Sequence, residues 1–172
     1  MTLKFAAIAA AAALLSSSAI AQDAKPNDAQ IAHIAYTAGQ IDIRSAELAL
    51  SKSKNNQVRD FAREMVRDHS SVNQQALALV HKLHVTPRDN PTSQQLVAQA
   101  NAKAAELRRL NGAAFDKAYA DNEVAFHKTV DNALEQTLIP DASNPELKDL
   151  LSTGLKIFQG HEQHAEHLAQ SL

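Results

Sequence analysis

The chain has 172 residues, with 17 basic and 19 acidic side chains, eight histidines and no cysteine. The resulting net charge of −2 argues against a nucleic-acid partner, because such proteins carry a basic patch. The lack of cysteine excludes disulfides, thiolate metal sites and a lipid-modified N-terminal cysteine. Only four glycines and 4% aromatic residues, together with many alanines, favour helices over sheets.

The first residues have the pattern of an export signal. Lys4 precedes an apolar run, and Ala19-Ile20-Ala21 has the small-x-small pattern of a cleavage site. The run is too short for a membrane span, which takes ~20 residues, and no later stretch approaches that length. We therefore expect a periplasmic protein with a signal peptide at 1–21 cleaved after Ala21, a flexible lead-in at 22–27 and a single domain at 28–172.

Apolar spacings of three, four and seven predict two long helices, over roughly 28–53 and 56–83. Asn27 or Asp28 can cap the first helix, and Asn55-Asn56 separates the two and can cap the second. The stripe of the second helix is continuous and consists of Val58, Phe61, Met65, His69, Val72, Ala76, Leu79 and Leu83. Beside it, Arg63 and Arg67 are expected to form ordinary helical ion pairs with Glu64 and Asp68.

Prolines and polar residues at 85–92 predict a loop, after which Thr92 or Ser93 caps a shorter helix over roughly 93–110. Asn111-Gly112 is expected to end that helix with a left-handed C-cap. Two further helices are predicted over roughly 113–138 and 145–170, with a loop at 140–145 between them.

Apolar stripes on separate helices are buried only by packing against each other. We therefore predict an all-α protein, an antiparallel four-helix bundle with one additional short helix. No stretch of the sequence predicts a strand.

Five polar residues lie on or beside the apolar stripes: His69, His127, His161, Asp42 and Glu123. Counted from the predicted helix ends at 1.5 Å per residue, Asp42 is level with His69 and Glu123 is level with His161. A buried imidazole without a partner loses solvation free energy. These side chains are therefore expected to converge on one polar centre in the core.

Two interpretations of this centre stay open. It is either a site for one transition-metal ion (zinc, iron, copper or manganese) or a hydrogen-bonded network in which Asp42 and Glu123 orient the imidazoles. A metal-dependent oxidoreductase is disfavoured, because the chain has no Glu-x-x-His motif; its nearest pair is Glu123-x-x-x-His127. We assign no catalytic residue, and the leading hypothesis is a non-catalytic, envelope- or stress-associated binding protein with unknown protein partners and oligomeric state.

Two segments resemble a known family. Residues 58–70 resemble the "fA..mv.DH(S/T)" segment, and residues 110–119 the "L.G..FD..Y" segment, of the exported bacterial family called domain of unknown function 4142. His127 and His161 fall where that family has histidines. The resemblance covers roughly 28–170 and implies a signal peptide and a ferritin-like helical bundle, but no established activity; members are often labelled predicted outer membrane proteins.

The chain departs from the family pattern at two places. Asp42 stands where the family tends to have glutamate, which shortens the reach of the carboxylate by one methylene. Leu155-Lys156 stands where the family often has Leu-Pro before its last histidine.

Overall fold

The computed structural model describes residues 25–172, which contain helices and no strand. The elements are α1 (Asp28–Lys52), α2 (Asn56–Lys82), α3 (Pro91–Arg109), α4 (Gly112–Ala133), a π-helix η1 (Leu134–Leu138), α5 (Ile139–Asp141) and α6 (Pro145–Ser171). The expected signal peptide at 1–21 lies outside the described residues. None of the helices within 25–172 is long and apolar enough to cross a membrane.

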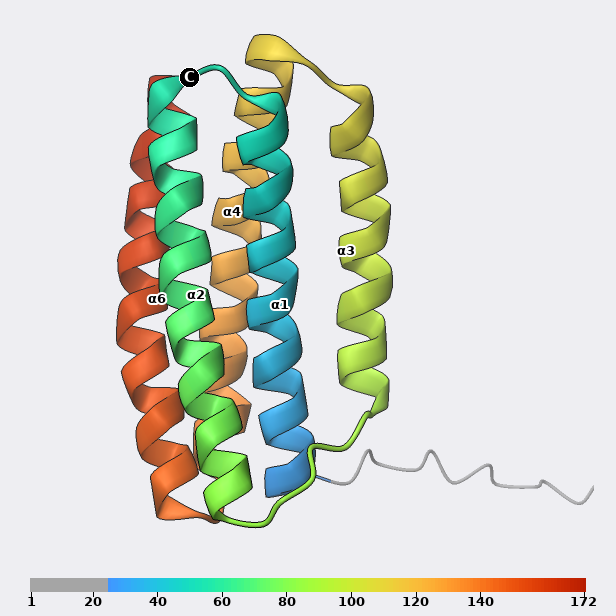
Figure 1. Ribbon diagram of the computed structural model, residues 1–172, viewed down its shortest axis with the longest axis vertical. Helices are drawn as coiled ribbons and strands as arrows, with labels where there is room; N and C mark the ends of the chain where they lie inside the picture. Colours follow the sequence, from blue (N-terminus) through green and yellow to red (C-terminus); the bar gives the residue numbers. More distant parts are fainter. Residues whose placement is uncertain (1–24) are drawn as a thin grey trace, which may run out of the picture.

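Four of the helices form an antiparallel bundle, which confirms the predicted all-α fold. α1 packs on α2, and α4 packs on α6, while α3 lies outside the bundle beside α1 (Figure 1). Helix α3 brings the chain from the lower end of α2 back to the upper end of α4, so α2 and α4 run in the same direction.

Asparagine is the N-cap residue of most of the long helices. Asn27, Asn55, Asn90 and Asn144 each accept hydrogen bonds from backbone N–H groups of the following turn. The prediction that Thr92 or Ser93 caps α3 was wrong, because the helix begins at Pro91. Proline suits the first helical position, where its missing N–H costs nothing.

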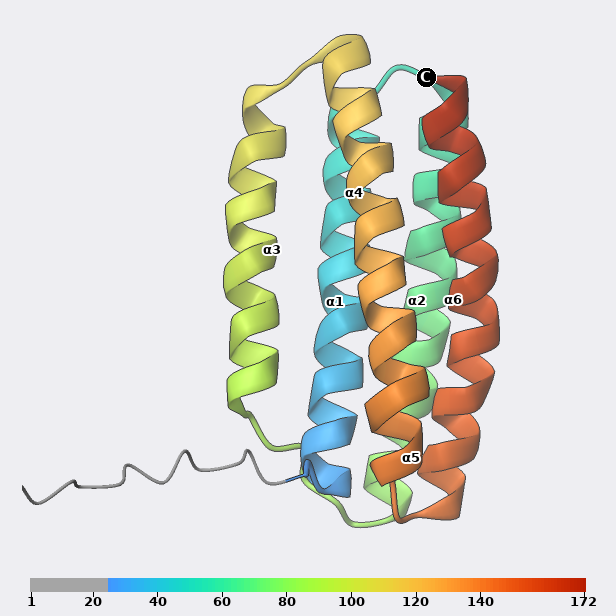
Figure 2. The same cartoon turned by 180° about the vertical axis from the view of Figure 1, so that it is seen from behind.

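The lower end of α4 also differs from the prediction of a regular helix followed by a loop. The Ile139 N–H donates to the Leu134 carbonyl five residues earlier, and the chain stays helical through Pro140 (Figure 2). Proline lacks an N–H and its ring crowds the carbonyl four residues before it, which favours this wider turn.

The connection from α3 to α4 is a further correction. Gly112 has the expected positive φ of 56°, but it begins α4, and α3 is capped by the extended residue Leu110.

The bundle core consists of two apolar clusters with a polar layer between them. The upper cluster includes Phe61, Met65, Phe115, Tyr119 and Ala165, and the lower cluster includes Ile31, Ile34, Leu134, Leu151 and Phe158. On each bundle helix, a buried polar residue separates the members of one cluster from those of the other: Asp42, His69, His127 and His161. The apolar halves therefore hold four helices in a register that brings these polar groups together.

Candidate metal centre

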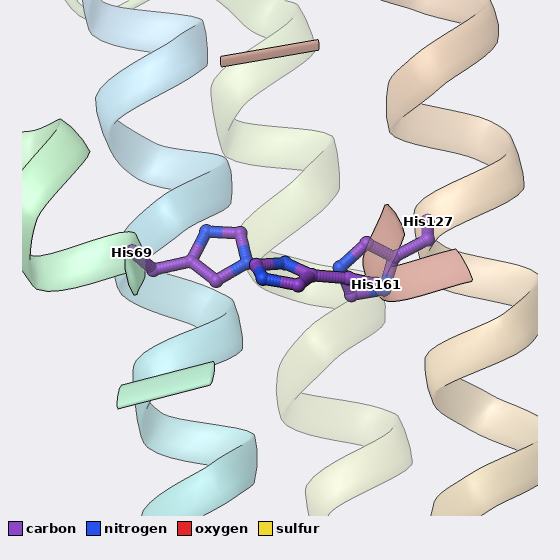
Figure 3. A group of neighbouring side chains, drawn as sticks. All are labelled: His69, His127 and His161. Carbon is purple, nitrogen blue, oxygen red and sulfur yellow. The ribbon is translucent and has the colours of Figure 1, made fainter. Parts of the chain in front are cut away.

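Three imidazoles from three helices meet in the polar layer. His69, His127 and His161 are at most 3% exposed, and each offers a ring nitrogen within 4.8 Å of the others. Figure 3 shows the three rings extending toward one another from α2, α4 and α6. The structure thus brings together the three histidines singled out from the sequence.

Asp42, on the fourth bundle helix α1, contributes a carboxylate to the polar layer. Its Oδ2 atom lies 2.9 Å from His69 Nε2 and 3.4 Å from His127 Nε2, so Asp42 and His69 are level as predicted. Neither contact has hydrogen-bond geometry. Both oxygens of Asp42, both ring nitrogens of His69 and Nε2 of His127 have no hydrogen-bond partner within residues 25–172.

Hydrogen bonds on the side away from the centre orient the imidazole rings of His127 and His161. His127 Nδ1 donates to the backbone carbonyl of Glu123 at 2.9 Å, which leaves Nε2 facing the centre. His161 Nε2 lies 3.1 Å from Asp68 Oδ2, which leaves a buried Nδ1 without a partner in the described part of the chain. Outer hydrogen bonds of this kind orient the imidazoles of metal sites.

Glu123 lies on the Asp42 side of the layer. It is fully buried, and its Oε1 accepts a hydrogen bond from Ser45 Oγ at 2.7 Å. Its Oε2 lies 4.0 Å from His127 Nδ1. Asp42, Glu123 and His127 could hold an ion as one ligand set and the three histidines as another, and His127 belongs to both.

The chain matches one known protein family along most of its length. The model of the family described as domain of unknown function (DUF4142) matches residues 13–168, which confirms the resemblance seen in the motifs. The chain belongs to the DUF4142 family. No curated protein and no solved structure matched it. Because the family description assigns no activity, the function of this DUF4142 protein has to be argued from its site.

The two carboxyls of the site differ in protonation. Burial alone would raise the pKa of Asp42, but electrostatic interaction with the neighbouring imidazoles of His69 and His127 outweighs it and holds that pKa below its usual range. Burial raises the pKa of Glu123 well above its usual range, and the charge of Asp42 raises it further. The site therefore favours the charged form of Asp42 and the protonated form of Glu123.

Burial also keeps two of the imidazoles neutral. It lowers the pKa of His127, and it lowers the pKa of His161 to about 4 although the hydrogen bond to Asp68 opposes the change. Neutral imidazoles present nitrogen lone pairs, which are what a metal ion binds.

Several contributors to this site were missed in the sequence. Asp68 does form the predicted ion pair with Arg67, at 2.7 Å, but it also contacts His161. Phe158 stacks on His69, with ring centroids 4.5 Å apart. Asp68 directly precedes His69, and Phe158 lies three residues before His161; nothing in the sequence shows that each contacts the histidine of another helix.

Proposed function

We propose that this DUF4142 protein binds one transition-metal ion in its polar layer. In this proposal the imidazoles of His69, His127 and His161 hold the ion, and Asp42 supplies an oxygen ligand and a compensating charge. Glu123 supports Asp42 and His127 from beside the ion. The observation that carries the proposal is the convergence of three buried imidazoles whose inward nitrogens have no hydrogen-bond partner within residues 25–172.

The distances in the layer fit this role. Ligands that bind zinc tetrahedrally at about 2.0–2.1 Å stand about 3.3 Å apart from one another. The two contacts of Asp42 Oδ2, at 2.9 Å with His69 and 3.4 Å with His127, lie on either side of that value. The ring nitrogens of the three histidines lie within 4.8 Å of one another, and binding of the ion would draw them closer, toward this spacing.

The hydrogen-bonded network is the second candidate, and the same atoms count against it. A network stabilises a core when its members are paired, whereas a half-paired network costs free energy. Asp42 and His69 lie within reach of each other but lack hydrogen-bond geometry. A metal ion would bind one ring nitrogen of each of the three histidines and an oxygen of Asp42 at once.

The donor set favours zinc, iron or copper over manganese, because imidazole suits those metals and manganese prefers oxygen ligands. If Asp42 joins the three imidazoles on one ion, as proposed, they would form a closed ligand set of the structural kind, which supports binding rather than catalysis. We place this function in the periplasm, in an envelope- or stress-associated role, because the sequence at 1–21 has the pattern expected of an export signal.

The test is elemental analysis of the tag-free mature protein beside two variants. His69→Ala removes a central ligand, and His167→Ala is the matched control, because His167 is exposed on α6. We expect about one metal ion per chain in the wild type and in His167→Ala, and none in His69→Ala. Circular dichroism verifies that each variant is folded.

The opposite result would support the network. In that case the wild type takes up no metal even after incubation with zinc, iron, copper and manganese. His69→Ala would then lose ~1–3 kcal/mol of stability through its unpaired neighbours, with no metal to lose.

A further inference from the structure

A cavity of about 560 Å³ lies directly below the polar layer, in the lower half of the bundle. Its wall includes Ala38, Asn73 and Phe158, which lie within four residues of Asp42, His69 and His161 respectively. The volume falls within the range of about 300–1,000 Å³ that is typical of small-molecule sites. It is therefore large enough for an organic ligand beside the proposed metal centre.

The cavity reaches the surface where α3 begins. Lys25, Pro91 and Thr92 belong to its wall and are exposed. The deeper wall is mostly aliphatic and includes Ile34, Val80, Leu96, Leu134, Leu147 and Leu151. Aliphatic side chains around an open space gain contacts when an apolar molecule fills it.

Within this apolar wall one amide donor has no partner. Asn73 is 5% exposed, lines the cavity, and its Nδ2 makes no hydrogen bond within residues 25–172. Gly39 makes room for it, since a Cβ at that position would lie 2.5 Å from Asn73 Oδ1. An unpaired buried N–H is satisfied by a ligand that brings an oxygen acceptor.

The charges around the cavity exclude an ionic ligand. Among its described lining residues, only Lys25 and Asp141 are charged, and they pair with each other at 2.8 Å. A carboxylate or phosphate inside would lose its hydration without gaining a counter-ion. The chemistry of the wall therefore suits an uncharged molecule.

The backbone of the wall is unusual as well. The π-helix η1 contributes Leu134, Thr137 and Leu138 to the cavity. Single π-turns within α-helices occur frequently at functional sites. This widened turn is a feature of the backbone, independent of the side-chain chemistry, that coincides with the cavity.

We propose that the cavity binds an uncharged, mainly aliphatic small molecule with one hydrogen-bond acceptor, such as a medium-chain alcohol. Its oxygen accepts a hydrogen bond from Asn73 Nδ2 once the amide, which is buried as it stands, rotates toward the cavity. Its chain lies along the aliphatic wall toward α3. This site is separate from the proposed metal centre, from which the ring of Phe158 divides it. Its occupation does not require the metal.

The test uses metal-free mature protein and the uncharged fluorescent dye N-phenyl-1-naphthylamine, with decan-1-ol as the displacing ligand. Ala76→Phe fills the cavity from its half-buried position in the α2 wall. Ala102→Phe is the same change on the exposed face of α3 and outside the cavity wall. We expect saturable dye binding, displaced by decan-1-ol, in the wild type and Ala102→Phe, and at least tenfold weaker dye binding in Ala76→Phe.

A second variant tests the hydrogen bond and does not depend on filling the cavity. Asn73→Leu keeps the size of the side chain but removes the donor. We expect decan-1-ol to bind about threefold to tenfold more weakly to this variant, as for the loss of one hydrogen bond, while the dye binds as before.

Three results would overturn the proposal: no saturable dye binding by folded wild type, unchanged dye binding by Ala76→Phe, or decan-1-ol binding that Asn73→Leu leaves unchanged. Displacement of the dye by decanoate as readily as by decan-1-ol would overturn the assignment of an uncharged ligand. Because all samples are free of metal, none of these results depends on the elemental analysis that tests the metal centre.

Discussion

The ring of Phe158 stacks on the imidazole of His69, with centroids 4.5 Å apart and planes 11° from parallel. The same ring forms part of the cavity wall. Phe158 therefore fixes one face of the central imidazole and separates the polar layer from the apolar space below it.

Replacing Phe158 by leucine tests whether this stacking orients His69. Phe158→Leu keeps an apolar side chain but loses the ring contact, so we expect zinc affinity to fall about tenfold through a less ordered imidazole, the lower end of the range for such supporting residues. Stability of the metal-free protein should fall by ~1–2 kcal/mol through lost packing. Competition with a chromogenic chelator measures the affinity, and urea denaturation measures the stability.

The matched control is Phe115→Leu, in the upper apolar cluster. It should lower stability without changing zinc affinity. An equal loss of zinc affinity in both variants would mean that the affinity follows stability and not the orientation of His69.

Asp68→Ala should weaken metal binding while leaving the fold intact. Its carboxylate accepts a hydrogen bond from His161 Nε2 and thereby directs Nδ1 into the centre. Removing such an outer partner typically costs about 10–100-fold in metal affinity. The side chain is 23% exposed, so a large loss of stability is not expected.

The control for Asp68 is Asp60→Ala on the same helix. Asp60 is exposed and bonds only to Arg63 within the described residues. Zinc affinity should be unchanged in this variant. If Asp68→Ala also binds zinc like the wild type, His161 does not need its outer hydrogen bond.

Ser45→Ala should destabilise the metal-free protein by up to ~1–3 kcal/mol, because it leaves a buried oxygen of Glu123 with only the longer hydrogen bond from Asn122 Nδ2, at 3.4 Å. Ser51→Ala is the control, since Ser51 is exposed and its hydroxyl bonds, among residues 25–172, only to the carbonyl of Leu48. Urea denaturation of both variants measures the difference. Equal stabilities would show that the hydrogen bond to Glu123 contributes nothing.

Asp131 should make the stability of the metal-free protein fall as pH rises. Burial, and then the charges of Glu162 and Glu135, raise the pKa of Asp131 from 3.8 to about 7. The folded protein therefore binds more protons than the unfolded chain between about pH 4 and pH 7. Stability is highest below that window and is lost as pH rises through it.

Asp131→Asn removes this titration while keeping the shape of the side chain. We expect the variant to be more stable than the wild type at pH 8 and close to it at pH 4, as measured by urea denaturation in the presence of a chelator. Parallel stability curves for the two proteins across this range would show that Asp131 titrates normally.

Local patterns in the sequence predicted the helices and the central polar residues. The stripe through Met65, His69 and Val72 repeats at helical spacing, so it shows which face of α2 is buried without knowledge of its neighbours. Counting along two helices joined by a short loop also placed Asp42 level with His69. Both inferences depend only on helix geometry and on residues close in the chain.

The tertiary structure decided which helices lie next to each other and how each is rotated about its axis. Contacts such as Asp68 with His161 and Phe158 with His69 join α2 and α6, which are far apart in the sequence. The cavity and the unpaired amide of Asn73 likewise exist only once the bundle helices, α3 and η1 surround a common space. Helical periodicity specifies which residues face the core, but side-chain packing between helices specifies which residues they meet there.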